Sequence, residues 1–153
     1  MIYLDNNGTT FMTDEVRGKI GRLLQEPLGN PASNGELSKR AAALLAEARK
    51  STAELVGAEP DKLIFTSSGS ESNVTVISAA TRMLRRSAVV VSAIEHASIS
   101  TFLPHLEEQG IEVRVVPVLA GGAVDIEQLI DAIDANVALV SLQAVNNETG
   151  VIQ

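Results

Sequence analysis

The chain has 153 residues, of which 45% are hydrophobic and 20% are charged. This balance is typical of one globular domain and excludes collagen-like, coiled-coil and broadly disordered proteins. The 12 Lys and Arg against 19 Asp and Glu give a formal net charge of -7, and a field of that sign repels phosphate backbones and anionic lipid surfaces. The basic cluster of Arg82, Arg85 and Arg86 is interpreted as a solvated helix end. We therefore expect no nucleic-acid partner and no membrane partner.

The chain contains no cysteine, which excludes disulfides, thiolate metal ligands and a thiol nucleophile within these residues. No apolar run reaches the roughly 20 residues that a membrane span needs. The beginning of the chain, residues 1–5, lacks the basic and then apolar pattern of a signal peptide. The expected location is therefore the cytoplasm.

Helical and strand patterns alternate along the chain. The first helix is predicted over 13–24, with Thr13 as its N-cap, and it ends before a proline-containing loop at 27–31. The remaining elements are predicted as a helix at 34–55 ending near Gly57, a strand at 62–66, a helix at 70–84, a strand at 88–92, a helix at 97–109, a strand at 111–116, a helix at 126–133 and a strand at 137–142. Strands separated by helices of this length indicate β-α-β units. The expected fold class is α/β, with three layers in which helices flank a mostly parallel sheet.

Three polar segments lie next to the predicted strands, at residues 67–73, 93–96 and 146–150. In an open α/β sheet the loops at the carboxyl ends of the strands form the functional edge, because helix N-termini and free backbone groups meet there. These three segments are therefore the candidate ligand site.

The first polar segment combines small residues, hydroxyl groups and the start of a helix. This combination suits a phosphate group, although the spacing is not that of a Walker loop. The same residues also fit an ordinary helix start capped by serine, with Glu71 in the first turn. The segment alone leaves both interpretations open.

The other two segments each carry one side chain suited to chemistry. His96 follows a predicted buried strand, where an imidazole is able to stack on an aromatic cofactor or to move protons near neutral pH. Asn147 follows the last strand and offers an amide donor or acceptor. A helix cap or core position for His96, and a plain turn for Asn147, are the alternatives. His105 lies inside a predicted helix and is interpreted as structural, and no residues are spaced as metal ligands.

Six stretches, taken in order, match the pattern of one family. They are YLDNNGTT at 3–10, GNPAS at 29–33, VGAEPD at 56–61, FTSSGSES at 65–72, SAIEH at 92–96 and NNETGVIQ at 146–153. The chain thereby resembles the cysteine desulfurases of the NifS/IscS type, class-V aminotransferase enzymes of fold-type I that depend on pyridoxal 5'-phosphate (PLP).

The resemblance implies roles for four residues. Gly69 and Ser70 would bind the phosphate of PLP, His96 would be catalytic and stack over the pyridine ring, and Asn147 would hydrogen-bond the phenolic oxygen of the ring. It also implies that residues 1–12 belong to a small domain and that residues 13–153 form the first half of the large PLP-binding domain. The expected fold is therefore an incomplete PLP-dependent transferase-like large domain.

The chain departs from the family pattern at several positions. Phe11 stands where the family usually has proline, and Ser70 stands where threonine is commoner. Residues 34–37 read Asn-Gly-Glu-Leu, where the family usually has a His and a Gly shortly after the GNPxS stretch. Family members also continue with an Asp for the pyridine nitrogen, the Schiff-base Lys and the Cys that takes the sulfur. The lysines here lie outside the three polar segments, at positions 19, 39, 50 and 62.

We therefore expect the N-terminal portion of a PLP-dependent cysteine desulfurase, inactive by itself. The portion alone is expected to be inactive because covalent chemistry of this kind needs both an amine and a thiolate. The complete enzyme would convert L-cysteine to L-alanine and transfer sulfur as a persulfide, for iron-sulfur cluster assembly or thiolation. A C-terminal complement, a homodimer and a sulfur acceptor protein are the implied partners. A related class-V aminotransferase or lyase with another substrate, and a non-catalytic truncated scaffold protein, are the alternatives.

Overall fold

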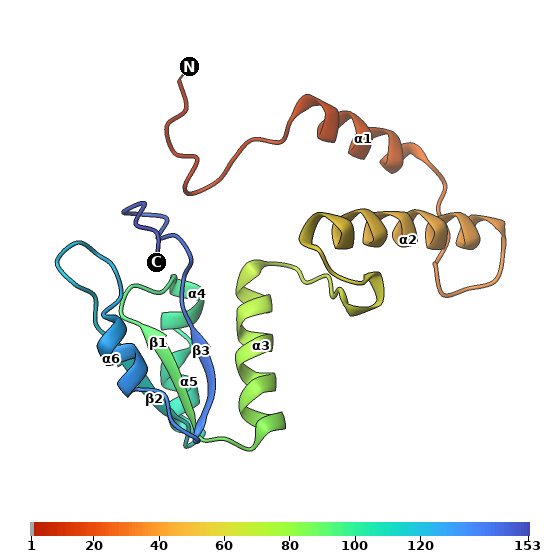
Figure 1. Cartoon of the computed structure of the whole chain (residues 1–153). Coiled ribbons are helices and arrows are strands. Elements are labelled where there is room, and N and C mark those ends of the chain that lie inside the picture. Colours follow the sequence, from red (N-terminus) through yellow and green to blue (C-terminus); the bar gives the residue numbers. More distant parts are fainter. Residues whose placement is uncertain (1) are drawn as a thin grey trace. The chain divides into compact units, whose positions relative to one another are not determined.

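The computed structural model describes residues 2–153, which separate into two compact units (Figure 1). The first unit ends at Phe65, and the second unit is Thr66–Gln153. The expected small-domain segment, residues 1–12, begins with Met1, which lies outside the described residues. The boundary expected after residue 12 concerns the complete enzyme and stays a prediction.

The first unit is built on two helices, both of which the sequence predicts. Helix α1 (Asp14–Gln25) begins at Thr13, whose hydroxyl accepts the N–H of Val16 at 3.3 Å. Helix α2 (Glu36–Val56) ends at Gly57, which adopts a left-handed φ of 66° and returns its N–H to the last turn. Local capping signals therefore fix the beginning of α1 and the end of α2.

The strand predicted at 62–66 is wrong. A short 3-10 helix, η1 (Pro60–Lys62), occupies its beginning, and Leu63 then has extended backbone angles without joining any ladder among residues 2–153. A strand needs a partner for its backbone groups. Here the carbonyl of Leu63 instead accepts a hydrogen bond from the guanidinium of Arg49, which also lies 5.1 Å from the ring centre of Phe65.

The second unit is a parallel sheet with helices between its strands. The three strands are hydrogen-bonded in the order β2-β1-β3, all parallel. The elements are α3 (Gly69–Leu84), β1 (Ala88–Ser92), α4 (Ala97–Ser100), α5 (Leu103–Glu108), β2 (Glu112–Val116), α6 (Ile126–Asp131) and β3 (Val137–Ser141). Of the helices in residues 2–153, none has both the length and the apolar character needed to cross a bilayer.

The helix predicted over 97–109 is divided into two helices in the structure. Helix α4 ends at Ser100, and α5 begins at Leu103 with Pro104 in its first turn. Proline lacks the N–H that would bond the carbonyl four residues earlier, and its ring collides with that carbonyl. Because the carbonyl in question belongs to Ser100, a continuous helix has to stop there.

The core lies on both faces of β1, whose five residues are all buried. On one face, Val90 packs in a cluster with Val116 and with Leu129 of α6. On the other face, Val89 and Val91 pack against apolar residues of the remaining helices, namely Ile77 of α3, Ile99 of α4 and Leu106 of α5. The predicted three-layer α/β arrangement is therefore confirmed, and it explains why the strand reads as a continuous β-branched run.

Truncating the centre of this sheet should cost much more than truncating its edge. We expect Val90→Ala to lower the free energy of unfolding by roughly 2 kcal/mol, because Val90 is 0% exposed and the lost methyl groups leave a cavity. The matched control is Val115→Ala on β2, which is 55% exposed and should change the stability by less than about 0.5 kcal/mol. Urea unfolding of both variants measures the difference, and equal losses would contradict this account of the core.

Candidate functional site

The three polar segments all belong to the second unit and meet at one end of its sheet. The strands are parallel, so the chain leaves β1 and β3 at the same edge. Figure 1 shows the beginning of α3, helix α4 and the segment after β3 at that end. Hydrogen bonds made by side chains, to other side chains and to the backbone, then join these parts of the chain.

The first segment is a capped helix start. The hydroxyl of Ser68 accepts the N–H of Glu71 at 3.2 Å, while the Glu71 carboxylate accepts the hydroxyl and the N–H of Ser67, both at 2.6 Å. The Ser67 hydroxyl and, after it, the Ser67 N–H hold the pKa of Glu71 below its ordinary value. The capping interpretation of this segment is therefore correct. The cap does not use the two residues that follow Ser68.

Those two residues, Gly69 and Ser70, are exposed in the first turn of the 16-residue helix α3. First-turn N–H groups have no acceptor within their own helix. Among residues 2–153 the Ser70 hydroxyl has no hydrogen-bond partner, and a Cβ added to Gly69 would meet open space. The turn thus presents two N–H groups and one hydroxyl at the positive end of a helix dipole.

The second segment positions His96 as the N-cap of α4. Its Nδ1 accepts the N–H of Ser98 at 3.0 Å and lies 2.9 Å from the Ser98 hydroxyl oxygen. That oxygen also lies 2.8 Å from the amide nitrogen of Asn73, on the second turn of α3. Capping therefore uses only one ring nitrogen of His96, and the Asn73–Ser98 contact ties α3 to the histidine loop.

Glu95, in the second segment, joins the end of β1 to the residues that follow β3. Its Oε1 accepts the hydroxyl of Ser92, at the end of β1, at 2.7 Å. The same oxygen accepts the backbone N–H of Gln143, just beyond β3, at 2.8 Å. One half-buried carboxylate therefore holds the two strand ends together.

The third segment folds around Asn146, which is only 7% exposed. Its side-chain oxygen accepts the N–H of Glu148 at 2.9 Å and of Thr149 at 2.8 Å, and its amide donates to the carbonyl of Ile94 at 3.2 Å. The turn interpretation of this segment is thus correct for Asn146. The neighbouring Asn147 is exposed, and its oxygen accepts the Gln143 amide at 3.1 Å. Within residues 2–153 the Asn147 amide nitrogen has no partner.

A cleft of about 310 Å³ opens between the second and third segments. His96 and Asn147 both line it, together with Ile94, Glu95, Ala97, Asn146, Glu148 and Thr149. Gly69 and Ser70 do not line it. They lie one helical turn before Asn73, which reaches the cleft wall through Ser98. The structure therefore brings His96 and Asn147 together directly and places the first turn of α3 beside them.

The groups available here fit PLP. Unused N–H and hydroxyl donors at a helix start suit its phosphate, a flat exposed imidazole suits its ring, and the unpartnered amide nitrogen of Asn147 suits its phenolic oxygen. The cleft volume is at the lower end of the range for small-molecule sites. The individual roles of Gly69, Ser70, His96 and Asn147 stay predictions.

Sequence reasoning missed the residues that connect the segments. Asn73 and Ser98 are 25 positions apart, and Glu95 and Gln143 are 48 apart. No local sequence pattern predicts contacts between residues so far apart. Among these residues only Asn146 has a local sequence signal. An asparagine side chain is able to accept the backbone N–H groups two and three residues further along the chain and so to form an Asx turn.

Comparisons with known proteins give consistent matches. The family model described as "Aminotransferase class-V" matches residues 2–153. A cysteine desulfurase of Cereibacter sphaeroides is 41% identical over 154 residues, covering 99% of this chain and 40% of the relative. A solved structure described as a NifS-like protein superimposes with a TM-score of 0.92 at 31% identity, covering 97% of this chain and 41% of the other. Another, described as SspA in complex with cysteine, has a TM-score of 0.86 at 28% identity and covers 96% and 43%. The chain thus spans about 40% of the length of the proteins it matches.

The lowered pKa of Glu71 predicts a pH-dependent contribution to stability. A carboxylate whose pKa is lowered by folding stabilises the protein above its unfolded pKa, and this contribution is lost as the pH falls through the folded pKa. We therefore expect Glu71→Gln to melt at a lower temperature than wild type at about pH 7, and the gap to close towards about pH 3. Melting followed by circular dichroism measures the gap.

The matched control is Glu47→Gln, which changes an exposed glutamate on α2 that has no side-chain partner among residues 2–153. Its melting temperature should equal that of wild type at both pH values. A gap for Glu71→Gln that is the same at both pH values would show that its hydrogen bonds do not depend on the charge.

Proposed function

The chain belongs to the aminotransferase class-V family, and from this premise we propose that it forms the cofactor-gripping part of a PLP-dependent cysteine desulfurase. The complete enzyme would convert L-cysteine to L-alanine and transfer the sulfur as a persulfide. The observation that carries the proposal is the meeting of three polar segments, each of which leaves a donor or ring unused by the fold. The similar cysteine desulfurase and the similar protein solved with cysteine support this choice of substrate.

In this proposal each segment holds one part of the cofactor. The N–H groups of Gly69 and Ser70, with the Ser70 hydroxyl, bind the phosphate at the first turn of α3. The imidazole of His96 packs on the ring, and the Asn147 amide donates to the phenolic oxygen. When bound, PLP supplies an electron sink for the substrate carbon. His96 lines the same cleft, and in this proposal its second ring nitrogen, Nε2, would hold or move a proton there.

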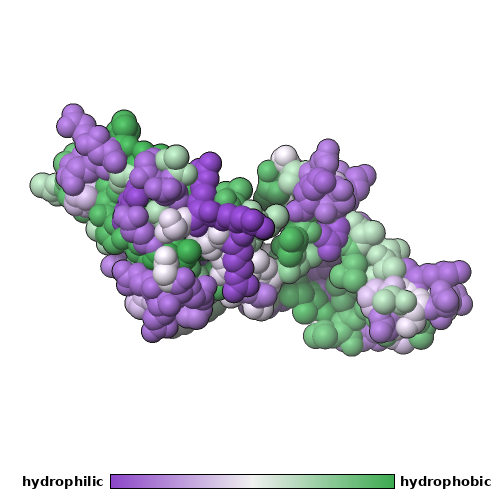
Figure 2. Space-filling view, turned by 90° about the horizontal axis from the view of Figure 1, so that it is seen from below, coloured by the Kyte–Doolittle hydropathy of each residue, from purple (hydrophilic) through white to green (hydrophobic). Residues whose placement is uncertain are grey.

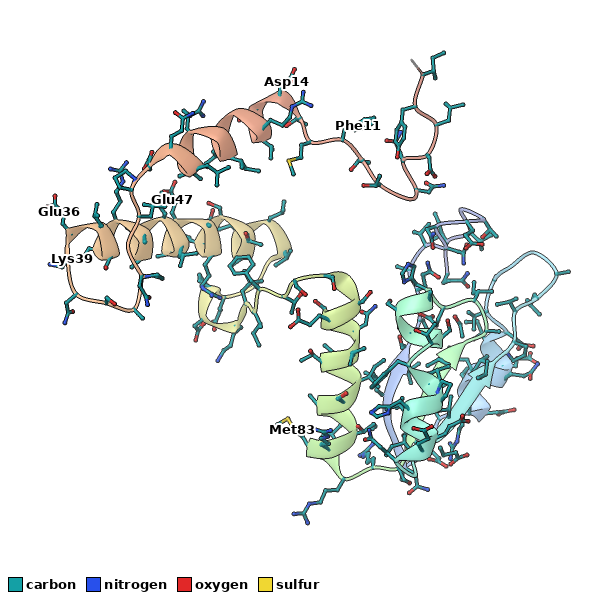
Figure 3. The ribbon with its side chains drawn as sticks, turned by 180° about the vertical axis from the view of Figure 1, so that it is seen from behind. Phe11, Asp14, Glu36, Lys39, Glu47 and Met83 are labelled. Carbon is teal, nitrogen blue, oxygen red and sulfur yellow. The ribbon has the colours of Figure 1, made fainter. Side chains whose placement is uncertain are left out.

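The reactive amine and thiol would come from a complementary segment. The four lysines all belong to the first unit, with Lys19 on α1, Lys39 and Lys50 on α2, and Lys62 in η1, and Figure 3 shows Lys39 on its helix. The described part of the second unit therefore contains no lysine, and the sequence has no cysteine. A desulfurase needs both groups.

Unpaired surface supports such a complement. In the described residues β2 and β3 each pair with β1 alone, so each keeps an open edge. Figure 2 shows apolar side chains at the surface, and large exposed apolar residues include Leu55, Ile64 and Met83, the last labelled in Figure 3. Assembly as a homodimer in the cytoplasm, with an acceptor protein that takes sulfur for iron-sulfur clusters, completes the proposal.

Co-expression tests the proposed function. The partner is the part of the Cereibacter sphaeroides enzyme that follows its match to this chain, and the readouts are PLP content and alanine release from L-cysteine. We expect an assembled, active complex, in which Ser70→Ala and Asn147→Ala each weaken PLP binding about tenfold, since a hydrogen bond to a charged group contributes about 1.5–3 kcal/mol. Ser100→Ala, on the exposed side of α4, is the matched control and should bind PLP normally. An assembled complex that releases no alanine would contradict the proposal.

The positions of the lysines give a second prediction. PLP reduced onto the assembled complex with borohydride should be found by peptide mapping on a lysine of the complement. Lys19, Lys39, Lys50 and Lys62 should carry none above the level found with the isolated chain, because none of them belongs to the unit that holds the three segments. Stoichiometric labelling of any of these four would overturn the assignment of the amine to the complement.

A further inference from the structure

Two hydrogen bonds in series run from α3 to the imidazole of His96, and a third joins the backbone of Ser98 to the same ring. The Asn73 amide nitrogen lies 2.8 Å from the Ser98 hydroxyl oxygen, and that oxygen lies 2.9 Å from Nδ1 of His96. The backbone N–H of Ser98 reaches the same Nδ1 at 3.0 Å. Asn73 and Ser98 are both half-buried, whereas His96 is exposed.

The backbone N–H of Ser98 determines which group donates and which accepts in each of these hydrogen bonds. A backbone N–H is only a donor, so Nδ1 of His96 has to be an acceptor and carries no proton. The single hydroxyl proton of Ser98 then also points at Nδ1. The lone pairs of the Ser98 oxygen are left for Asn73, which must present its NH2 group rather than its carbonyl. All three bonds agree on one arrangement of protons.

We propose that Asn73 and Ser98 are positioning residues that hold His96 as the Nε2–H tautomer and fix the plane of its ring. Both donors approach the same ring nitrogen, so the imidazole is anchored at one edge. Nε2 is the nitrogen on the other edge, and within residues 2–153 it has no partner. His96 therefore contributes a flat ring and a single N–H donor, that of Nε2, to the lining of the cleft.

The arrangement couples the histidine to the phosphate-binding turn, a consequence that rests on the proposed function. Ser70 and Asn73 are three residues apart on α3, and residues at this spacing share one face of a helix. A ligand that anchors at the first turn of α3 thereby acts on the helix that orients the ring. The same segment that recognises an anion also sets the orientation of the imidazole.

Nitrogen NMR of the chain labelled with 15N-histidine tests the proposal without PLP. Above the titration range of the imidazole, the two-bond proton couplings to Nδ1 and Nε2 distinguish the tautomers. His105→Gln assigns the two histidines, and magic-angle spinning allows the measurement on an assembled sample. We expect His96 to be the Nε2–H tautomer. A wild-type spectrum of the Nδ1–H tautomer would overturn the proposal, whatever the variants do.

Two substitutions test the two links separately. Ser98→Ala removes the hydroxyl donor, and Asn73→Asp replaces the NH2 group with an acceptor that turns the Ser98 hydroxyl away from Nδ1. Each should raise the ratio of Nδ1–H to Nε2–H about fivefold, the effect of losing one neutral hydrogen bond of about 1 kcal/mol. Ser98→Thr, which keeps the hydroxyl, and Ser100→Ala, on the same helix, should keep the wild-type ratio.

Unchanged ratios in Ser98→Ala and Asn73→Asp, with native circular dichroism, would reduce the contact to helix capping and overturn the proposal. Its failure is distinct from failure of the proposed function, because the tautomer is measured without cofactor. A complex that binds PLP and releases alanine while His96 keeps one tautomer in every variant would leave the desulfurase function standing and remove only the positioning role.

Discussion

The parallel pairing of β1 with both of its neighbours is the constraint on which the rest of the second unit depends. β1 is hydrogen-bonded to β2 on one edge and to β3 on the other, so it is the middle strand, and it is also buried on both faces. Parallel pairing then sends the chain out of β1 and β3 at one edge. Because of this geometry, residues more than 40 positions apart in the sequence meet there. The hydrogen bond between Glu95 and Gln143 is an example.

The polar groups at this edge divide into those that build the loops and those left over. Glu95 and Asn146 use their oxygens to hold strand ends and turns, and one ring nitrogen of His96 caps a helix. Capping and binding are therefore not competing interpretations of these segments. A loop can satisfy its own backbone with some residues and present neighbouring ones, as Ser68 and Ser70 do two positions apart in one turn.

Sequence reasoning succeeded where the signal is local and failed where it depends on distant residues. The helix start at Thr13, the helix end at Gly57 and the buried strand β1 can each be predicted from residues within a few positions. All three predictions are confirmed. The strand at 62–66 has suitable residues but no partner strand in the described part of the chain. The break before α5 has a local signal in Pro104, but the predicted helix over 97–109 runs through it, because the sequence around Pro104 is otherwise typical of one continuous helix. For the site, the residues that face outward were predictable by type, whereas connectors such as Asn73 and Ser98 were not.

The proposed binding of an anion at this edge is compatible with an acidic chain, because net charge and local hydrogen bonding act over different ranges. The net charge of -7 is spread over the whole sequence, and at physiological ionic strength charges more than about 8 Å away are largely screened. The first turn of α3 would instead act at hydrogen-bond distance, with the positive end of its dipole towards a bound anion. The nearest carboxylate in that turn, Glu71, is already bonded to Ser67. Since one helix turn alone contributes modestly, the proposed binding of PLP would also need the ring contacts proposed for the other two segments. Their convergence therefore matters more than any single motif.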